Sequence, residues 1–152
     1  MGPKSRLAAD AWGSLLRVHA ALVPRFDESV RTAAGLPLAW YDVLLELAHA
    51  PDNRLRVGEL GERVVLSRSR VSRVVDEMAG RGLVAKEDDA IDRRSAFAVL
   101  TPAGRTSFEA AASVYVRAIE EQFAAPLTSA ELRTLTALLE RIINLEAERP
   151  AR

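Results

Sequence analysis

The residues with the clearest chemical potential are the arginines and serines of the stretch LSRSRVSRVVDEMAGRGLV, from Leu66 to Val84. Guanidinium groups bind phosphates and the acceptor edge of guanine, and serine hydroxyls contact either. Between Arg54 and Arg73 there are six arginines and two acidic residues. The whole chain balances 21 Lys and Arg against 21 Asp and Glu, so the positive charge is local. This distribution favours a nucleic-acid contact in this stretch, with a solvated helix face as the alternative.

A helix over residues 68–79 would place the polar residues on one face and the apolar residues on the opposite face. At about 100° per residue, one face carries the apolar residues Val71, Val74, Val75 and Met78. The other face carries Ser69, Ser72, Arg73 and Asp76, and Ser67 stands where its hydroxyl could cap the helix. A short helix over Val57 to Val64 precedes it through a tight joint. The pair predicts a helix-turn-helix whose second helix enters a DNA major groove.

A β-hairpin is predicted directly after this helix, from the runs LVAKE (83–87) and SAFAVL (95–100). Arg93 and Arg94 lie near its tip, where arginine could enter the minor groove, and Asp92 could orient an arginine side chain. For Asp88 and Asp89 we expect an acidic turn that stays solvated.

Further helices are predicted before and after these elements. The first runs from Leu7 to Val30, and Pro24 inside it should kink it or break its hydrogen-bond ladder there. A second covers Leu38 to Ala50. Thr101 and Pro102 open another helix, Pro126 breaks it, and the capping box TSAE (128–131) starts the last. The apolar stripes of the last two helices need a cover, which favours dimerisation only weakly. The fold class is therefore mainly α with a small β-hairpin.

Several function classes are disfavoured. The chain has no cysteine and two histidines, so we expect no metal site and no thiol chemistry. No glycine-rich phosphate loop, nucleophile elbow or cofactor motif is present, so we expect neither an enzyme nor a cofactor. No apolar run approaches the ~20 residues of a membrane span, and no signal peptide is recognisable. These absences predict a cytoplasmic protein without membrane contact.

The motifs ELGERVVLSRSRVSRVVDEM, GLV and EDDAIDRRSAFAVLTPAGR together resemble the MarR family of winged helix-turn-helix regulators. The resemblance implies an obligate homodimer, with a major-groove helix and a wing in the minor groove. It gives a single domain, 1–152, with a DNA-binding lobe at 38–100 and dimerisation helices at 5–32 and 101–146. Gly61, Val65, Ala90 and Ile91 depart from the usual pattern. The predicted DNA-binding residues are Ser67, Arg68, Ser69, Arg70, Ser72, Arg73, Asp92, Arg93 and Arg94.

The family resemblance also implies regulation. We expect a transcriptional repressor on palindromic double-stranded DNA, released by a small aromatic or anionic effector. The candidate effector residues are Trp12, His19, Trp40 and Tyr41, although aromatic residues at helical spacing are more often simple core. The alternative function is a winged-helix protein-interaction module without sequence-specific DNA binding.

Overall fold

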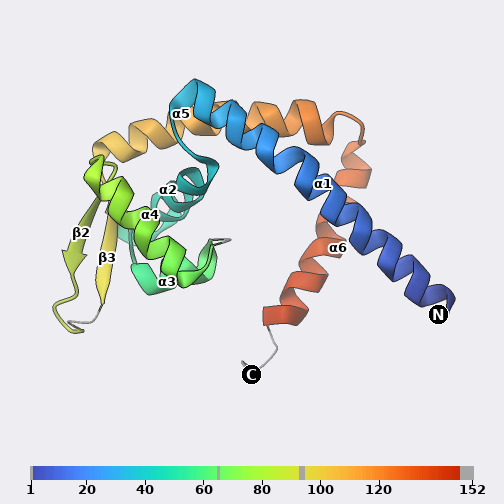
Figure 1. Cartoon of the computed structure of the whole chain (residues 1–152), viewed down its shortest axis with the longest axis horizontal. Coiled ribbons are helices and arrows are strands. Elements are labelled where there is room, and N and C mark those ends of the chain that lie inside the picture. Colours follow the sequence, from blue (N-terminus) through green and yellow to red (C-terminus); the bar gives the residue numbers. More distant parts are fainter. Residues whose placement is uncertain (1, 65, 93–94, 148–152) are drawn as a thin grey trace. The chain divides into compact units, whose positions relative to one another are not determined.

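The computed structural model describes residues 2–64, 66–92 and 95–147 (Figure 1). Its internal contacts define two compact units, Met1–Val116 and Arg117–Arg152. The first unit contains helices α1 to α4, the three strands and most of α5. No described helix is long and apolar enough to cross a membrane.

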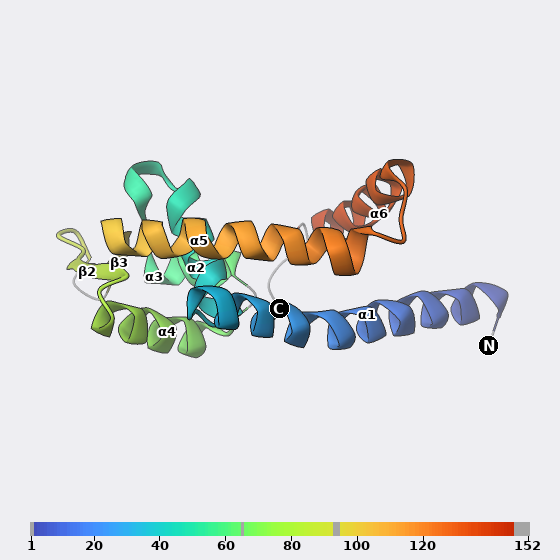
Figure 2. The same ribbon diagram turned by 90° about the horizontal axis from the view of Figure 1, so that it is seen from above.

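Helix α1 runs from Pro3 to Ala34, so Pro24 does not end the helix (Figure 2). Proline removes the hydrogen bond to the carbonyl four residues earlier, here that of Ala20. Ala20 is exposed, so water can satisfy that carbonyl. The helix ends at Gly35, whose φ of 68° is left-handed and whose N–H donates to the Arg31 carbonyl.

The DNA-binding lobe predicted from the sequence is built on the helices α2 (Leu38–His49), α3 (Val57–Arg63) and α4 (Arg68–Gly80). Figure 1 shows these helices gathered beside the hairpin. Its core residues include Val43, Leu44, Leu47, Leu60, Val71, Val75 and Met78, all fully buried. Val74 is also buried, so the apolar stripe predicted for α4 is confirmed.

The sheet has three antiparallel strands in the order β1-β3-β2, one more than predicted. Strands β2 (Val84–Asp88) and β3 (Ala96–Leu100) form the expected hairpin, with Val84 opposite Leu100 and Asp88 opposite Ala96. The additional strand β1 (Arg54–Arg56) follows a 3₁₀ turn, Pro51–Asn53, and pairs Leu55 with Ala98. It ties the start of α3 to the hairpin, with Arg56 opposite Phe97.

Helix α5 (Pro102–Ile119) starts where the sequence predicts, with Thr101 as its cap. The Gly104 N–H donates to Thr101 Oγ1 at 3.0 Å, and that hydroxyl lies 2.9 Å from the Leu83 carbonyl. Gly104 is buried here, and a side chain on it would collide with the same carbonyl. This close approach fixes the start of α5 against the start of the wing.

The second unit contains the end of α5, a π-helical turn at Glu120–Ala124 and helix α6 (Ser129–Ala147). Its capping box is confirmed. The Thr128 N–H donates to Glu131 Oε2 at 2.7 Å, and the Glu131 N–H donates to Thr128 Oγ1 at 3.3 Å.

Candidate DNA-binding surface and adjoining cavity

The outer face of α4 carries four of the predicted DNA-binding residues. Ser69, Arg70, Ser72 and Arg73 are exposed, while the valine stripe behind them is buried. Ser67 occupies the N-cap position but makes no capping hydrogen bond, because its hydroxyl lies 3.3 Å from that of Ser69. The predicted cap is therefore wrong. Arg68 begins the helix, and its side chain lies outside the described residues.

The six arginines between Arg54 and Arg73 fall into two groups, those in ion pairs within the lobe and those on α4. Arg54, Arg56 and Arg63 form ion pairs with Glu87, Asp89 and Glu46. The Arg54 guanidinium also lies 4.0 Å from the centre of the Phe97 ring. These three arginines stabilise the lobe. The remaining three, at positions 68, 70 and 73, all belong to α4, so a count of charge along the sequence overstated the free positive surface.

The wing contains a buried acid that the sequence did not predict. Asp88 is exposed, as expected, but Asp89 is only 3% exposed. Its Oδ1 accepts the Ile91 N–H at 2.9 Å, and its Oδ2 accepts Arg56 Nε at 2.8 Å. The Ile91 N–H first, and then Arg56, lower the pKa of Asp89 below its usual value. The expectation of a solvated Asp89 is wrong because Arg56, 33 residues away in sequence, reaches it.

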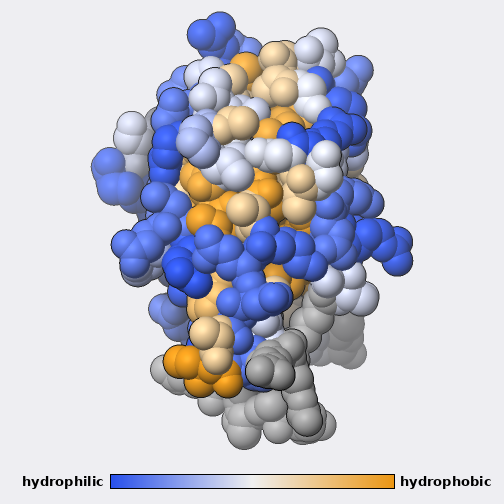
Figure 3. Space-filling model, turned by 90° about the vertical axis from the view of Figure 1, so that its left-hand side faces the viewer, coloured by the Kyte–Doolittle hydropathy of each residue, from blue (hydrophilic) through white to orange (hydrophobic). Residues whose placement is uncertain are grey.

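The remaining predicted wing residues are only partly described. Asp92 is exposed, and its backbone N–H lies 3.3 Å from Asp89 Oδ1. Arg93 and Arg94 lie outside the described residues. The predicted pairing of Asp92 with an arginine stays a prediction. Figure 3, which faces the side of the lobe that bears the strands, shows a surface that is largely hydrophilic with apolar side chains exposed between.

A cavity of about 630 Å³ lies beside α4, within the first unit. Helices α1, α2 and α4, the end of α3 and Tyr115 of α5 all contribute to its wall. His19 lines it, but the other three predicted effector residues do not. Trp12 is 61% exposed, two helical turns before His19. The structure therefore does not bring the four candidates together.

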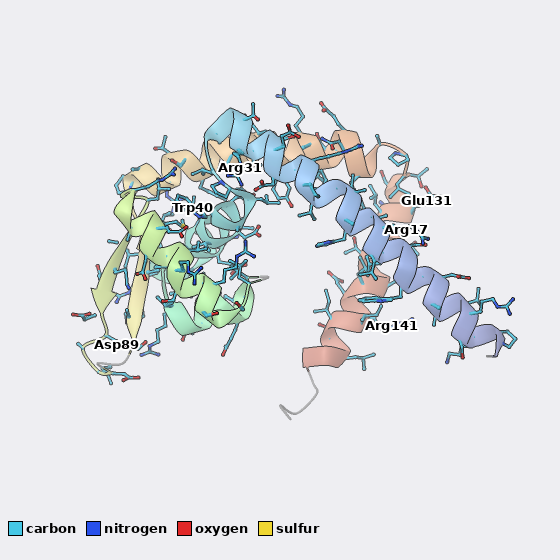
Figure 4. The ribbon with its side chains drawn as sticks, viewed as in Figure 1. Arg17, Arg31, Trp40, Asp89, Glu131 and Arg141 are labelled. Atoms are coloured by element: carbon cyan, nitrogen blue, oxygen red, sulfur yellow. The ribbon has the colours of Figure 1, made fainter. Side chains whose placement is uncertain are left out.

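Trp40 and Tyr41 are instead buried, Trp40 within the lobe and Tyr41 between α2 and α5. Trp40 is buried, with the Arg81 guanidinium 4.8 Å from its ring centre (Figure 4). Tyr41 packs with ring centres 5.5 Å from Phe108 and 5.0 Å from Tyr115. Both residues match the simpler interpretation of aromatics at helical spacing, which is core packing.

Three carboxylates line the cavity. Asp27 on α1 accepts the Leu38 N–H of α2 at 2.8 Å and pairs with Arg31. Burial raises the pKa of Asp27, but the Leu38 N–H and Arg31 outweigh it and lower the pKa overall. Glu46 lies 3.8 Å from Arg63. Burial, and then the neighbouring Glu46 charge, raise the pKa of Asp42. In the sequence, Asp42 and Glu46 could have been noticed as two acidic residues four positions apart on an otherwise apolar helix.

Among the described residues, no group of three or more His, Cys, Asp or Glu side chains could hold a metal ion.

Comparison with known proteins identifies the fold and its relatives. Residues 34–95 match the MarR family model. The chain is 27% identical over 145 residues to a protein from Thauera aromatica named as a transcriptional regulatory protein for the hcr operon, covering 95% of this chain and 86% of that one.

Solved structures agree. A MarR family transcriptional regulator from Streptomyces coelicolor in complex with DNA has a TM-score of 0.85 and 28% identity, over 100% of this chain and 92% of that one. AbsC, from the same organism, has a TM-score of 0.84 and 26% identity, over 98% of each chain. Residues 34–95 therefore form a MarR family domain, and the chain as a whole is similar to MarR family transcriptional regulators.

Proposed function

We propose that this protein binds a palindromic DNA operator as a homodimer and represses transcription from it. The observation that carries the proposal is the outer face of α4, where exposed Ser69, Arg70, Ser72 and Arg73 stand on a fully packed valine stripe. Such a helix presents bidentate arginine donors on a rigid support, as base reading in the major groove requires. The similar Streptomyces coelicolor regulator in complex with DNA supports the same use of this lobe.

Dimerisation is supported by apolar surface left uncovered within each unit. On α1, the side chains of Leu7, Trp12, Leu15, Leu16 and Val18 are exposed. On α6, those of Leu138, Ile142, Ile143 and Leu145 are exposed. Rows of this kind mark association surfaces. A two-fold dimer would present two copies of α4 to half-sites about one DNA turn apart.

The operator test is a titration against the DNA flanking the protein's own gene, at ~150 mM salt with excess nonspecific competitor. Saturable binding at two protomers per site is expected. Arg73→Ala should weaken it by about 1–3 kcal/mol if Arg73 contacts a base. Arg25→Ala, which removes an exposed arginine of α1, is the matched control and should bind as the wild type does. Unchanged affinity in Arg73→Ala would remove Arg73 from the reading set.

Competition separates this function from the alternative. Binding to any DNA that disappears under competitor, and in a random-sequence selection enriches no site, would favour a winged-helix protein-interaction module. Arg94→Ala tests the wing in the same assay, and should reduce affinity with less change in major-groove base preference.

We also propose that the cavity behind α4 holds a small effector that releases the DNA. Its wall includes Arg70 of α4 together with His19 of α1 and Asp42 of α2, so an occupant touches the recognition helix and its supports at once. A ligand that prefers one spacing of the two recognition helices would weaken both half-sites together. A matched probe pair, benzoate and benzylammonium, compares an anionic with a cationic ligand on one aromatic body.

The readout is operator release in the titration above. Asp42→Asn should improve binding of benzoate relative to benzylammonium, because it removes the half-buried negative charge. Equal response of wild type and variant to both probes would place the effector elsewhere.

A further inference from the structure

The tip of the wing is an internally bonded turn rather than a loose loop. The buried Asp89 carboxylate holds the backbone N–H groups of Ile91 and Asp92, and Arg56 of β1 holds it from the other side. Two further backbone bonds close the turn, from the Asp89 N–H to the Ser95 carbonyl and from the Ser95 N–H to the Asp92 carbonyl. Figure 4 places Asp89 at the far end of the hairpin. The described residues of the turn, 89–92 and 95, are thus joined by hydrogen bonds before they meet any partner.

This turn presents an apolar side chain to solvent. Ile91 is 91% exposed, more than any other large apolar side chain described as exposed. The others lie mainly in rows along α1 and α6, where neighbours at helical spacing make one continuous surface. Ile91 stands beyond the sheet, next to exposed Ala90 and Asp92. Its side chain gains nothing from folding, while its own N–H is bound to a buried charge.

The DNA minor groove is a surface that such a tip fits. Its walls are deoxyribose, so an apolar side chain gains contact there without a hydrogen-bond partner, and isoleucine is among the residues that proteins insert between base steps. A segment already held by such hydrogen bonds loses less conformational entropy on contact than an unbonded one. We propose that Ile91 is an apolar contact of the wing with the minor groove, and that the Arg56–Asp89 pair is the positioning device that presents it. This inference rests on the proposed operator binding and adds a residue that reads groove shape.

Salt dependence gives the proposal a specific signature. Loss of a cationic phosphate contact lowers the slope of log K against log salt by about one, because one fewer counterion is released. Loss of an apolar contact lowers affinity and leaves that slope unchanged. The two kinds of wing contact are therefore distinguishable in one titration series.

The experiment compares operator binding of the wild type, Ile91→Asn and Ile91→Val over ~50–300 mM salt, on the operator found above. Ile91→Asn should weaken binding about five- to thirtyfold with an unchanged slope, and Ile91→Val about twofold or less. Ala85→Asn, an exposed substitution on β2, is the matched control. Wild-type affinity in Ile91→Asn, or a loss accompanied by a lower slope, would overturn the inference. A wild type that binds no operator would instead overturn the proposed function.

The positioning role is tested by a double-variant cycle. Asp89→Asn removes the charge that holds the Ile91 N–H and pairs with Arg56, so it should weaken operator binding as Ile91→Asn does. The double variant should then lose little more than either single variant, because both remove the same contact. Losses that add fully would show that Asp89 acts on DNA independently of Ile91 and would overturn this step. Thermal unfolding of each variant checks that the lobe remains folded.

Discussion

Helices α1 and α4 both carry an apolar stripe at helical spacing, and only one of the two is covered within its own unit. On α4, Val71, Val75 and Met78 are fully buried against α2, α3 and the sheet. On α1, Leu7 is 71% exposed and Trp12 61%. The same periodicity therefore predicts which face of a helix is apolar, but not what covers that face. In α4 the cover belongs to the lobe, and in α1 we propose that it is a second copy.

The largest expected effect comes from breaking the covered stripe. Met78→Ala should lower the free energy of unfolding by about 2–5 kcal/mol, because a fully buried side chain leaves a cavity. Met78→Leu, which conserves volume, should cost less than about 1.5 kcal/mol. Urea unfolding followed by circular dichroism measures both. A loss below about 1 kcal/mol for Met78→Ala would mean that the lobe packs less tightly than described.

The matched change on the bare stripe is Leu16→Ala. Leu16 is about half exposed, so little of the unit's own stability depends on it. If a second copy covers it, the free energy of dimerisation should fall by roughly 2 kcal/mol, since two such side chains lose their cover per dimer. Sedimentation equilibrium over a range of concentrations measures this. Glu28→Ala, an exposed change on the same helix, should leave association unchanged, and equal association constants for all three proteins would contradict the covered stripe.

The two tryptophans report on the two regions separately. Trp40 is buried in the lobe and Trp12 is exposed on α1. In a Trp40→Phe protein, dilution below the dimerisation constant should shift the emission of Trp12 to longer wavelength as water reaches it. In a Trp12→Phe protein, the emission of Trp40 should stay constant over the same dilution. A shift in Trp40 alone would reverse the assignment of covered and bare stripes.

The smallest effect is expected from acid, and it acts on the wing. The folded pKa of Asp89 lies below its usual value, so the stabilisation it gives is present above the unfolded pKa and is lost as the pH falls through the folded one. NMR signals of the Ile91 and Asp92 amides should therefore move at a lower pH than an unperturbed aspartate would titrate. An Asp89→Asn protein should lack that transition. A midpoint at the ordinary aspartate pKa would contradict the described pairing.

Much of the fold could be predicted because its signals are local. The α4 stripe, the Thr101 cap and the Thr128–Glu131 box each depend on residues within one or two helical turns. Strand β1 could not be predicted, because an alternation of only three residues is too short to recognise and the strand exists only through its pairing with β3.

The site was predicted in part for the same reason. The exposed serine and arginine face of α4 follows from a helical wheel. The burial of Asp89 does not, because it needs Arg56 from another strand. The proposed effector residues shared a helical face or a neighbourhood in sequence, but a shared face does not bring Trp12 and His19, seven positions apart, to one cavity.

The hydrogen bond from the Leu38 N–H to Asp27 has a mechanical consequence. It joins α2 to α1 near one end of a helix of 32 residues, roughly 48 Å in length. Because α1 is held near one end at this bond, a tilt of about 5° at the bond would move the far end of the helix on the order of 3 Å. The coupling acts in both directions: a displacement of the far end of α1 would rotate α2 by a few degrees. The angle between α1 and α2, rather than any single contact, is then the quantity to measure when DNA binds or is released.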